Sequence, residues 1–130
     1  MTVLICGSRD WQDYPAVLQL LTKTHTVTPI ELIIEGGARG ADFYGRTAAI
    51  ALRVHYKTYP AEWDRYGKSA GYRRNKQMVD AKPDLVMAFQ LNGSKGTQHT
   101  IDLALAAGIR VILTDENGTR ELAPTANPSK

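Results

Sequence analysis

The chain has 130 residues, 43% of them hydrophobic and 22% charged, which fits one ordinary globular domain. Its formal net charge of +3 suits an anionic small molecule as well as nucleic acid as a partner. The single cysteine, Cys6, excludes an intramolecular disulfide framework and gives no zinc-ligand pattern. The apolar residues that precede it predict a buried thiol.

No apolar run approaches the roughly eighteen residues that a membrane span needs. The first residues, MTVLICG, are too few and lack the basic start of a secretory signal. We therefore expect a cytoplasmic protein that has no membrane partner.

Short apolar runs rich in β-branched residues recur along the chain and predict five strands. They lie at residues 3–6, 31–34, 54–59, 84–89 and 110–113. Segments with helical spacing separate them, one beginning after Asp13 and three more at about 39–52, 69–81 and 96–108. This alternation predicts an α/β fold with a doubly wound, mainly parallel five-stranded sheet and right-handed crossovers.

Local signals explain where the helices should begin and end. Asp13 is a good cap for the first helix, and Pro15 suits its first turn. The third helix should end before Pro83, because the residue before a proline is biased away from helical geometry. Gly108 suits the left-handed position that commonly ends a helix, here the fourth.

The last part of the chain carries weaker signals. Asn117-Gly118 is typical of a turn, and residues 123–130 predict a frayed tail. We therefore divide the chain into a domain of residues 1–113 and a C-terminal extension of residues 114–130, disordered in part.

In an open parallel sheet, ligands bind beyond the carboxyl ends of the strands, where the strand order reverses. Three of the loops expected there contain glycine: GSRDW at 7–11, GGARGAD at 36–42 and NGSKGT at 92–97. The second and third lead into predicted helices, whose first backbone N–H groups lack partners and attract anions. Glycines that let such backbone come close predict a phosphate cradle, best suited to a nucleotide. The alternative is that they only form tight turns.

Two familiar nucleotide-binding motifs are absent from the sequence. There is no G-x-x-x-x-G-K-[ST] motif, and the first loop has only Gly7 where a dinucleotide-binding enzyme would have G-x-G-x-x-G. His25, His55 and His99 lie far apart and show no metal-ligand spacing. We expect neither a metal nor a bound cofactor.

Three ordered segments carry a resemblance to a known family. ICGSRDW at 5–11, EGGARGAD at 35–42 and PAEWDRYGKSAGYRRNKQM at 60–78 resemble the YspA-like branch of the SLOG superfamily. This superfamily includes the Smf/DprA proteins and the Lonely Guy cytokinin-activating enzymes. The resemblance covers about residues 2–113 and implies a Rossmann-like three-layer fold that binds nucleotides.

The resemblance also suggests an activity. Lonely Guy enzymes hydrolyse the N-glycosidic bond of nucleoside 5′-monophosphates with an Arg in an R-K-x-x-M stretch and a Glu that ends P-G-G-x-G-T-x-x-E. Arg74 to Met78 fits the first motif, and residues 93–100 fit the second in part, with Thr100 in place of the Glu. Because a hydroxyl cannot replace that carboxylate, this substitution weakens the prediction of a hydrolase or transferase.

Two other functions stay open. The segment GGARGAD resembles the G-x-A-x-G-x-D segment of DprA, which binds single-stranded DNA, so nucleic acid is the second choice of partner after a nucleotide or nucleotide-derived metabolite. A nucleotide sensor without turnover is the other alternative. The sequence leaves a homo-oligomer open as well.

The candidate site follows from the loops and the resemblance together. Arg74 and Asp42 are the catalytic candidates, although Asp42 could equally cap its helix. Arg9 and Arg74 could pair with a phosphate or form surface ion pairs. The candidate ligand-binding residues are Gly7, Ser8, Arg9, Trp11, Gly36, Gly37, Arg39, Gly40, Asn75, Gly93, Ser94, Gly96 and Thr97.

Aromatic residues near these loops have two interpretations. Trp11, Trp63 and Tyr66 could stack on a base or pack the loop of residues 60–71 onto the body. Residues 61–68 show no clear periodicity and could form a lid over the ligand, with Gly67 and Gly71 as hinges.

Overall fold

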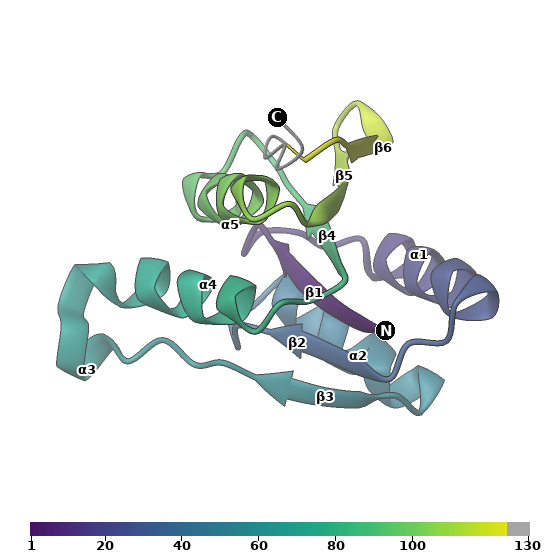
Figure 1. Ribbon diagram of the computed structural model, residues 1–130, viewed down its shortest axis with the longest axis horizontal. Helices are drawn as coiled ribbons and strands as arrows, with labels where there is room; N and C mark the ends of the chain where they lie inside the picture. Colours follow the sequence, from purple (N-terminus) through teal and green to yellow (C-terminus); the bar gives the residue numbers. More distant parts are fainter. Residues whose placement is uncertain (125–130) are drawn as a thin grey trace.

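The computed structural model describes residues 1–124 and contains a six-stranded sheet with the order β3-β2-β1-β4-β5-β6 (Figure 1). Neighbouring strands are parallel except for β6, which runs antiparallel to β5. The strands are β1 (Thr2–Gly7), β2 (Leu32–Glu35), β3 (His55–Thr58), β4 (Leu85–Phe89), β5 (Arg110–Asp115) and β6 (Gly118–Leu122).

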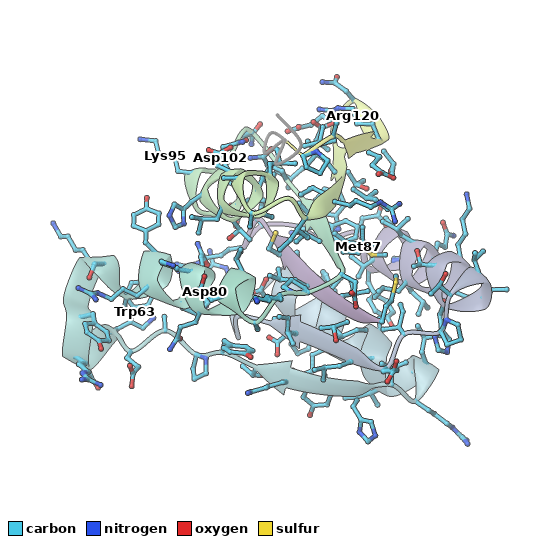
Figure 2. All side chains as sticks on the ribbon, viewed as in Figure 1. Trp63, Asp80, Met87, Lys95, Asp102 and Arg120 are labelled. Carbon is cyan, nitrogen blue, oxygen red and sulfur yellow. The ribbon has the colours of Figure 1, made fainter. Side chains whose placement is uncertain are left out.

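Helices cover both faces of this sheet, which confirms the predicted Rossmann-like three-layer α/β fold. On one face, α1 and α2 bury Val17 and Ala48 against strand residues that include Ile5 and Met87, and Met87 lies near the centre of the molecule (Figure 2). The helices of the chain are α1 (Tyr14–Val27), α2 (Ala41–Leu52), α3 (Trp63–Tyr66), the 3-10 turn η1 (Gly67–Ser69), α4 (Ala70–Asp80) and α5 (Lys95–Ala106).

The opposite face of the sheet is covered by α4 and α5. Met78 of α4 and Ile101 of α5 pack on strand residues that include Leu4 and Val86. Because successive side chains of a strand point to opposite faces, Cys6 also faces this second layer, in which it is buried. The buried thiol predicted from its apolar neighbours is confirmed.

The strand order reverses at the centre of the sheet. From β1 the chain continues to β2 and β3 on one side, and it then crosses to β4 and β5 on the other side. In doubly wound sheets this switch point, beyond the carboxyl ends of β1 and β4, is where ligands bind.

The predicted helix signals have the expected roles. The Asp13 carboxylate accepts a hydrogen bond of 3.1 Å from the Ala16 N–H, and Gly108 follows the end of α5 with a φ of +78°. α4 ends at Asp80, before Pro83. None of the helices in the described part of the chain is long and apolar enough to cross a membrane.

The prediction of five strands is wrong in number, because β6 adds a sixth. The predicted turn at Asn117-Gly118 closes a hairpin between β5 and β6, in which Asp115 pairs with Gly118. Two ion pairs join β6 to β5 at this edge of the sheet. Arg110 lies 2.8 Å from Glu121, and Arg120, which is labelled in Figure 2, lies 2.9 Å from Asp115. β6 is exposed along most of its length, so its sequence lacks the apolar alternation that reveals a strand.

Two further predictions concern segments without periodicity. Residues 63–69, which overlap the stretch of residues 61–68 interpreted as a lid, form the short helix α3 and the turn η1. The proposal that they close over a ligand stays a prediction. Residues 125–130 of the predicted frayed tail lie outside the described residues.

Gly45 lets α2 approach the sheet. A Cβ on Gly45 would lie 2.8 Å from Ile5 Cγ2, whereas a Cβ on Gly96 of α5 would meet no atom within 4 Å. We expect Gly45→Ala to lower the free energy of unfolding by about 1–2 kcal/mol, since overpacking outweighs the gain in helix propensity. Gly96→Ala should be neutral or stabilising by up to about 1 kcal/mol. Urea denaturation measures both, and equal effects would contradict the close packing of α2 on β1.

Candidate functional site

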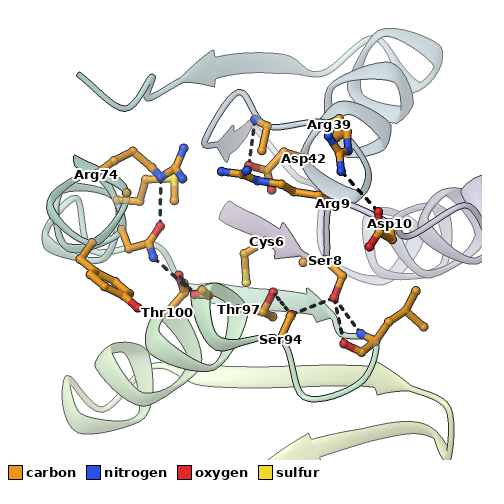
Figure 3. Close-up of a pocket in the computed structure, with 18 of the residues that line it drawn as sticks. Cys6, Ser8, Arg9, Asp10, Arg39, Asp42, Arg74, Ser94, Thr97 and Thr100 are labelled. Carbon is orange, nitrogen blue, oxygen red and sulfur yellow. Dashed lines mark hydrogen bonds and ion pairs between the residues drawn. The ribbon is translucent and has the colours of Figure 1, made fainter. Parts of the chain in front are cut away.

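A cavity of about 570 Å³ lies at the switch point, beyond the carboxyl ends of β1 and β4 (Figure 3). We call it the rim cavity. Its walls come from the loops after β1, β2 and β4 and from one face of α4 and α5. The residues predicted from the sequence that line it are Gly7, Ser8, Arg9, Arg39, Asp42, Arg74, Asn75, Ser94, Gly96 and Thr97.

Ser8 ties the three loops together. Its N–H donates to the Phe89 carbonyl at 2.8 Å, and its own carbonyl accepts from Ala41 N–H, the first residue of α2, at 3.3 Å. The side-chain oxygen accepts from Leu91 N–H at 2.7 Å and lies 2.8 Å from Ser94 Oγ. One nearly buried serine therefore fixes the relative positions of the loops after β1, β2 and β4 (Figure 3).

In the loop after β2, three backbone N–H groups donate hydrogen bonds to carboxylates of the protein itself. The Asp42 carboxylate accepts hydrogen bonds from Gly36 N–H at 3.1 Å and from Ala38 N–H at 3.3 Å. Glu35, fully buried at the end of β2, accepts from Gly37 N–H at 2.7 Å and from the Thr58 hydroxyl. The amides of Gly36, Gly37 and Ala38 are therefore not available to a phosphate, because the protein's own carboxylates accept their hydrogen bonds.

The glycines of this loop have intramolecular causes. Gly36 lies against the Arg74 guanidinium, which donates to the Gly36 carbonyl, and a Cβ there would also lie 2.9 Å from Asp42 Oδ2. Gly37 and Gly40 have φ values of +78° and +75°, and a Cβ on Gly40 would collide with backbone carbonyls of the loop after β1. The groups that come close to the backbone of these glycines are therefore side chains and backbone of the protein itself.

Two arginines and one buried carboxyl group dominate the electrostatics of the cavity. The Arg74 guanidinium donates to the Gly36 carbonyl and to Asn75 Oδ1, the latter at 3.0 Å. Burial lowers its pKa, the charge of Asp42 opposes the fall, and the charge of Arg9 adds to it. Burial raises the pKa of Asp42 to about 7, although Arg74 and the two amides oppose the rise. Among residues 1–124, neither Arg9 nor Arg74 forms an ion pair with a carboxylate.

Arg39 differs from these two arginines. Its guanidinium lies 3.5 Å from Asp10 at the mouth of the rim cavity, and both side chains are largely exposed. Such a pair contributes little free energy and is easily exchanged for a ligand contact.

The start of α5 keeps its amides free. Ser94 precedes the helix without a capping side-chain bond, and its hydroxyl instead donates to Thr97 Oγ1 at 2.9 Å. In the described part of the chain, the N–H groups of Lys95, Gly96 and Thr97 have no hydrogen-bond acceptor. Of the two predicted cradles, this one is available to an anion.

Thr100 occupies the position of the Lonely Guy glutamate and does line the rim cavity. It is buried, and its hydroxyl donates to the Gly96 carbonyl at 3.4 Å. Figure 3 shows Arg74 and Thr100 on the same side of the cavity and Ser8 on the other side. Cys6 lies between these two sides.

Five predicted residues do not line the cavity. Trp11 is part of the core, where its ring packs on Phe89 at 5.4 Å and its indole N–H donates to the Asp13 carbonyl, so it packs the first loop and is not placed to stack a base. Gly93 has a φ of +58° in the turn before α5. The other three, Gly36, Gly37 and Gly40, lie behind the lining in the loop after β2.

Sequence reasoning missed several lining residues on α4. Gly71 and Met78 join Arg74 and Asn75 on the wall of the cavity. These four positions have the spacing i, i+3, i+4, i+7 of one helix face, which was a usable signal once Arg74 was chosen. The further lining residues that were missed are Cys6, Asp10, Ala38, Lys68, Tyr72, Leu91 and Asn92.

No cluster of three or more His, Cys, Asp or Glu side chains suitable for a metal ion occurs within residues 1–124. The polar groups that line the rim cavity are guanidinium, hydroxyl and amide groups, which recognise anions, together with Asp10, Asp42 and Lys68.

Comparison with known proteins agrees with the resemblance seen in the sequence. A model of the family described as YspA, cpYpsA-related SLOG matches residues 1–66. The Gene 61 protein of Mycobacterium phage D29 is 40% identical over 116 residues, which cover 85% of this chain and 93% of the phage protein. No solved structure matches the chain. The chain therefore belongs to the YspA, cpYpsA-related SLOG family, as its motifs predicted.

Proposed function

We propose that the protein binds a nucleotide or nucleotide-derived metabolite in the rim cavity through the phosphate of the ligand. The observation that carries this proposal is the pair Arg9 and Arg74. Both guanidinium groups line one cavity, and neither forms an ion pair with a carboxylate among the described residues. The two groups also repel each other, because the charge of Arg9 lowers the pKa of Arg74, although the nearby Asp42 carboxyl opposes that effect. A phosphate between them replaces this repulsion by charged hydrogen bonds, each worth roughly 1.5–3 kcal/mol.

The start of α5 supports the same ligand from the other side of the cavity. Its three free N–H groups, together with the hydroxyl of Thr97, can donate to phosphate oxygens. A volume of about 570 Å³ also exceeds what a phosphate ion alone would fill and falls in the range of small-molecule sites. Membership of the SLOG superfamily suggests nucleotide-related binding, which supports a nucleoside as the rest of the ligand.

Hydrolysis of the N-glycosidic bond has weaker support than binding. Of the carboxylates that line the cavity, Asp10 is paired with Arg39, which leaves Asp42 as the group able to exchange a proton. A carboxyl group with a pKa of about 7 is well matched to acid–base chemistry near neutral pH. Its oxygen, however, already accepts two backbone N–H groups, as a structural cap does.

The binding proposal predicts a specific effect of Arg74→Ala. Calorimetric titration with AMP should show affinity reduced about 10- to 100-fold, from the loss of roughly 1.5–3 kcal/mol. The melting temperature without ligand should change little, because Arg74 forms no ion pair within residues 1–124 and its attraction to Asp42 and its repulsion with Arg9 oppose each other. Arg73→Ala is the matched control, since Arg73 is the next residue on α4 but lies outside the rim cavity.

Two results would contradict this proposal. A large loss of stability without ligand, combined with unchanged affinity for AMP, would make Arg74 a structural residue. Tight binding of a short single-stranded oligonucleotide, with a salt slope of several units instead of about one, would favour the DprA-like alternative.

Turnover is tested with AMP and the unmodified protein. With Thr100 in the glutamate position, we expect little free adenine by chromatography, because loss of such a carboxylate typically lowers a rate by roughly 10² to 10⁴. Rapid release of adenine that disappears in Asp42→Asn would instead show an enzyme in which Asp42 supplies the carboxylate.

The raised pKa of Asp42 predicts a pH-dependent difference in stability. The folded protein holds a proton at Asp42 up to about pH 7, whereas an unfolded aspartate loses it near pH 3.9, so this group makes folding less favourable as pH rises between these values. The melting temperature of Asp42→Asn minus that of the wild type should therefore increase from pH 5 to pH 8. Asp64→Asn, at an exposed position outside the cavity, is the control. A constant difference for Asp42→Asn would contradict the raised pKa.

A further inference from the structure

Two exposed aromatic side chains stand at the mouth of the rim cavity. Trp63 of α3 is 49% exposed and Tyr72 of α4 is 48% exposed, and both line the cavity. The other large apolar side chains that are exposed in the described chain, such as Phe43 and Tyr56, lie elsewhere. What distinguishes Trp63 and Tyr72 is that their half-exposed aromatic surface lines a cavity, where a bound ligand can cover it.

The Trp63 ring packs against Gly71 of α4. A Cβ on Gly71 would lie 3.3 Å from Cη2 of the Trp63 ring, closer than most such contacts, so a larger residue would push the ring outward. Gly71 also lies one turn before Arg74 on α4. The glycine therefore brings the indole near the arginine that we assign to the phosphate.

Tyr72 is held in place by a residue of α5. Its ring packs edge-on against His99 of α5, with centroids 4.5 Å apart and an interplanar angle of 62°. His99 Nδ1 in turn lies 3.3 Å from Asn75 Nδ2. The tyrosine is thus held by two helices and needs little further ordering when a ligand arrives, which favours affinity.

The two ends of the cavity differ in chemistry. Arg9 and the start of α5 lie over the ends of β1 and β4, whereas α3 and the first turn of α4 project beyond the strands, and Trp63 lies on that projection (Figures 1 and 2). A ligand that fills the cavity therefore meets Arg9 and the amides of α5 at its inner end and aromatic rings at its outer end, with Arg74 on the wall near the Trp63 ring.

From this arrangement we infer that Trp63 and Tyr72 stack on the base of a purine nucleotide whose phosphate occupies the inner end of the rim cavity. The inference rests on the proposed function and adds the base to it. Stacking accepts any base, since every base has a flat π-face, but the larger purine ring covers more aromatic surface than a pyrimidine does. The ligand class is thus a purine nucleoside 5′-phosphate.

The test compares AMP with ribose 5-phosphate, which has the same phosphate and sugar without the base. Calorimetric titration of the wild type should show AMP binding roughly 5- to 100-fold more tightly. Trp63→Leu and, separately, Tyr72→Leu should weaken AMP binding toward that of ribose 5-phosphate and leave the latter unchanged. Tyr56→Leu, which removes a tyrosine 44% exposed on β3 outside the cavity, should alter neither ligand.

Fluorescence gives an independent readout. The chain has two tryptophans, of which Trp11 is buried in the core and Trp63 is exposed. AMP should therefore quench the wild-type emission, and Trp63→Leu should abolish the quenching while its melting temperature stays close to that of the wild type.

The outcomes separate the two proposals. Equal affinities of the wild type for AMP and ribose 5-phosphate would overturn the aromatic site and leave the phosphate site standing. Binding of neither ligand would overturn the proposed function and this inference with it. A preference for AMP that survives both leucine variants would place the base elsewhere in the cavity.

Discussion

The arrangement of the candidate site depends on Ser8 and on the glycine before it. Gly7 ends β1 where the Phe89 carbonyl and the Ala41 side chain come so close that no Cβ fits, and Ser8 then bonds to the loops on both sides. In a doubly wound sheet these loops belong to segments far apart in the sequence, and nothing in the strands alone fixes one loop relative to another. One residue supplies that restraint with its N–H, its carbonyl and its hydroxyl. The cavity can therefore keep its shape without a ligand.

The protein uses its own carboxylates in the loop where a phosphate was expected. Asp42 and Glu35 accept hydrogen bonds from the amides of Gly36, Gly37 and Ala38, so these three amides are not available to a ligand. In the binding mode that we propose, Arg9, Arg74 and the start of α5 recognise the anion. The burial of Asp42 raises its pKa to about 7, so its charge near neutral pH only partly offsets the two arginines. A small change of pH near neutrality thus changes the electrostatic potential of the cavity without moving any helix or strand.

The sequence was sufficient for those features that local patterns determine. Apolar runs located the five parallel strands, and Asp13 and Gly108 located helix ends, because these signals act within a few residues. β6 was missed because an exposed edge strand needs no apolar face. The glycines of the second loop were recognised as close contacts, but the contacting groups lie far away in the chain: the Arg74 side chain, which contacts Gly36, is 38 residues away, and Gly40 lies against the backbone of Ser8 and Arg9. The packing of Trp11 on Phe89 likewise depends on the folded arrangement, which residue spacing does not reveal.

Cys6 provides a natural position in the cavity at which chemical modification can be followed. Its thiol is the only one in the chain, lies on the floor of the cavity and is buried among groups whose combined effect, burial above all, raises its pKa. A thiolate is the form that reacts with alkylating reagents, so this cysteine resists modification while the protein is folded. Because its side chain faces the cavity, a bound ligand would stand between it and the solvent. The rate at which a maleimide reacts with the protein then reports how often the thiol becomes exposed, an event that a ligand in the cavity would suppress, and no engineered probe is needed.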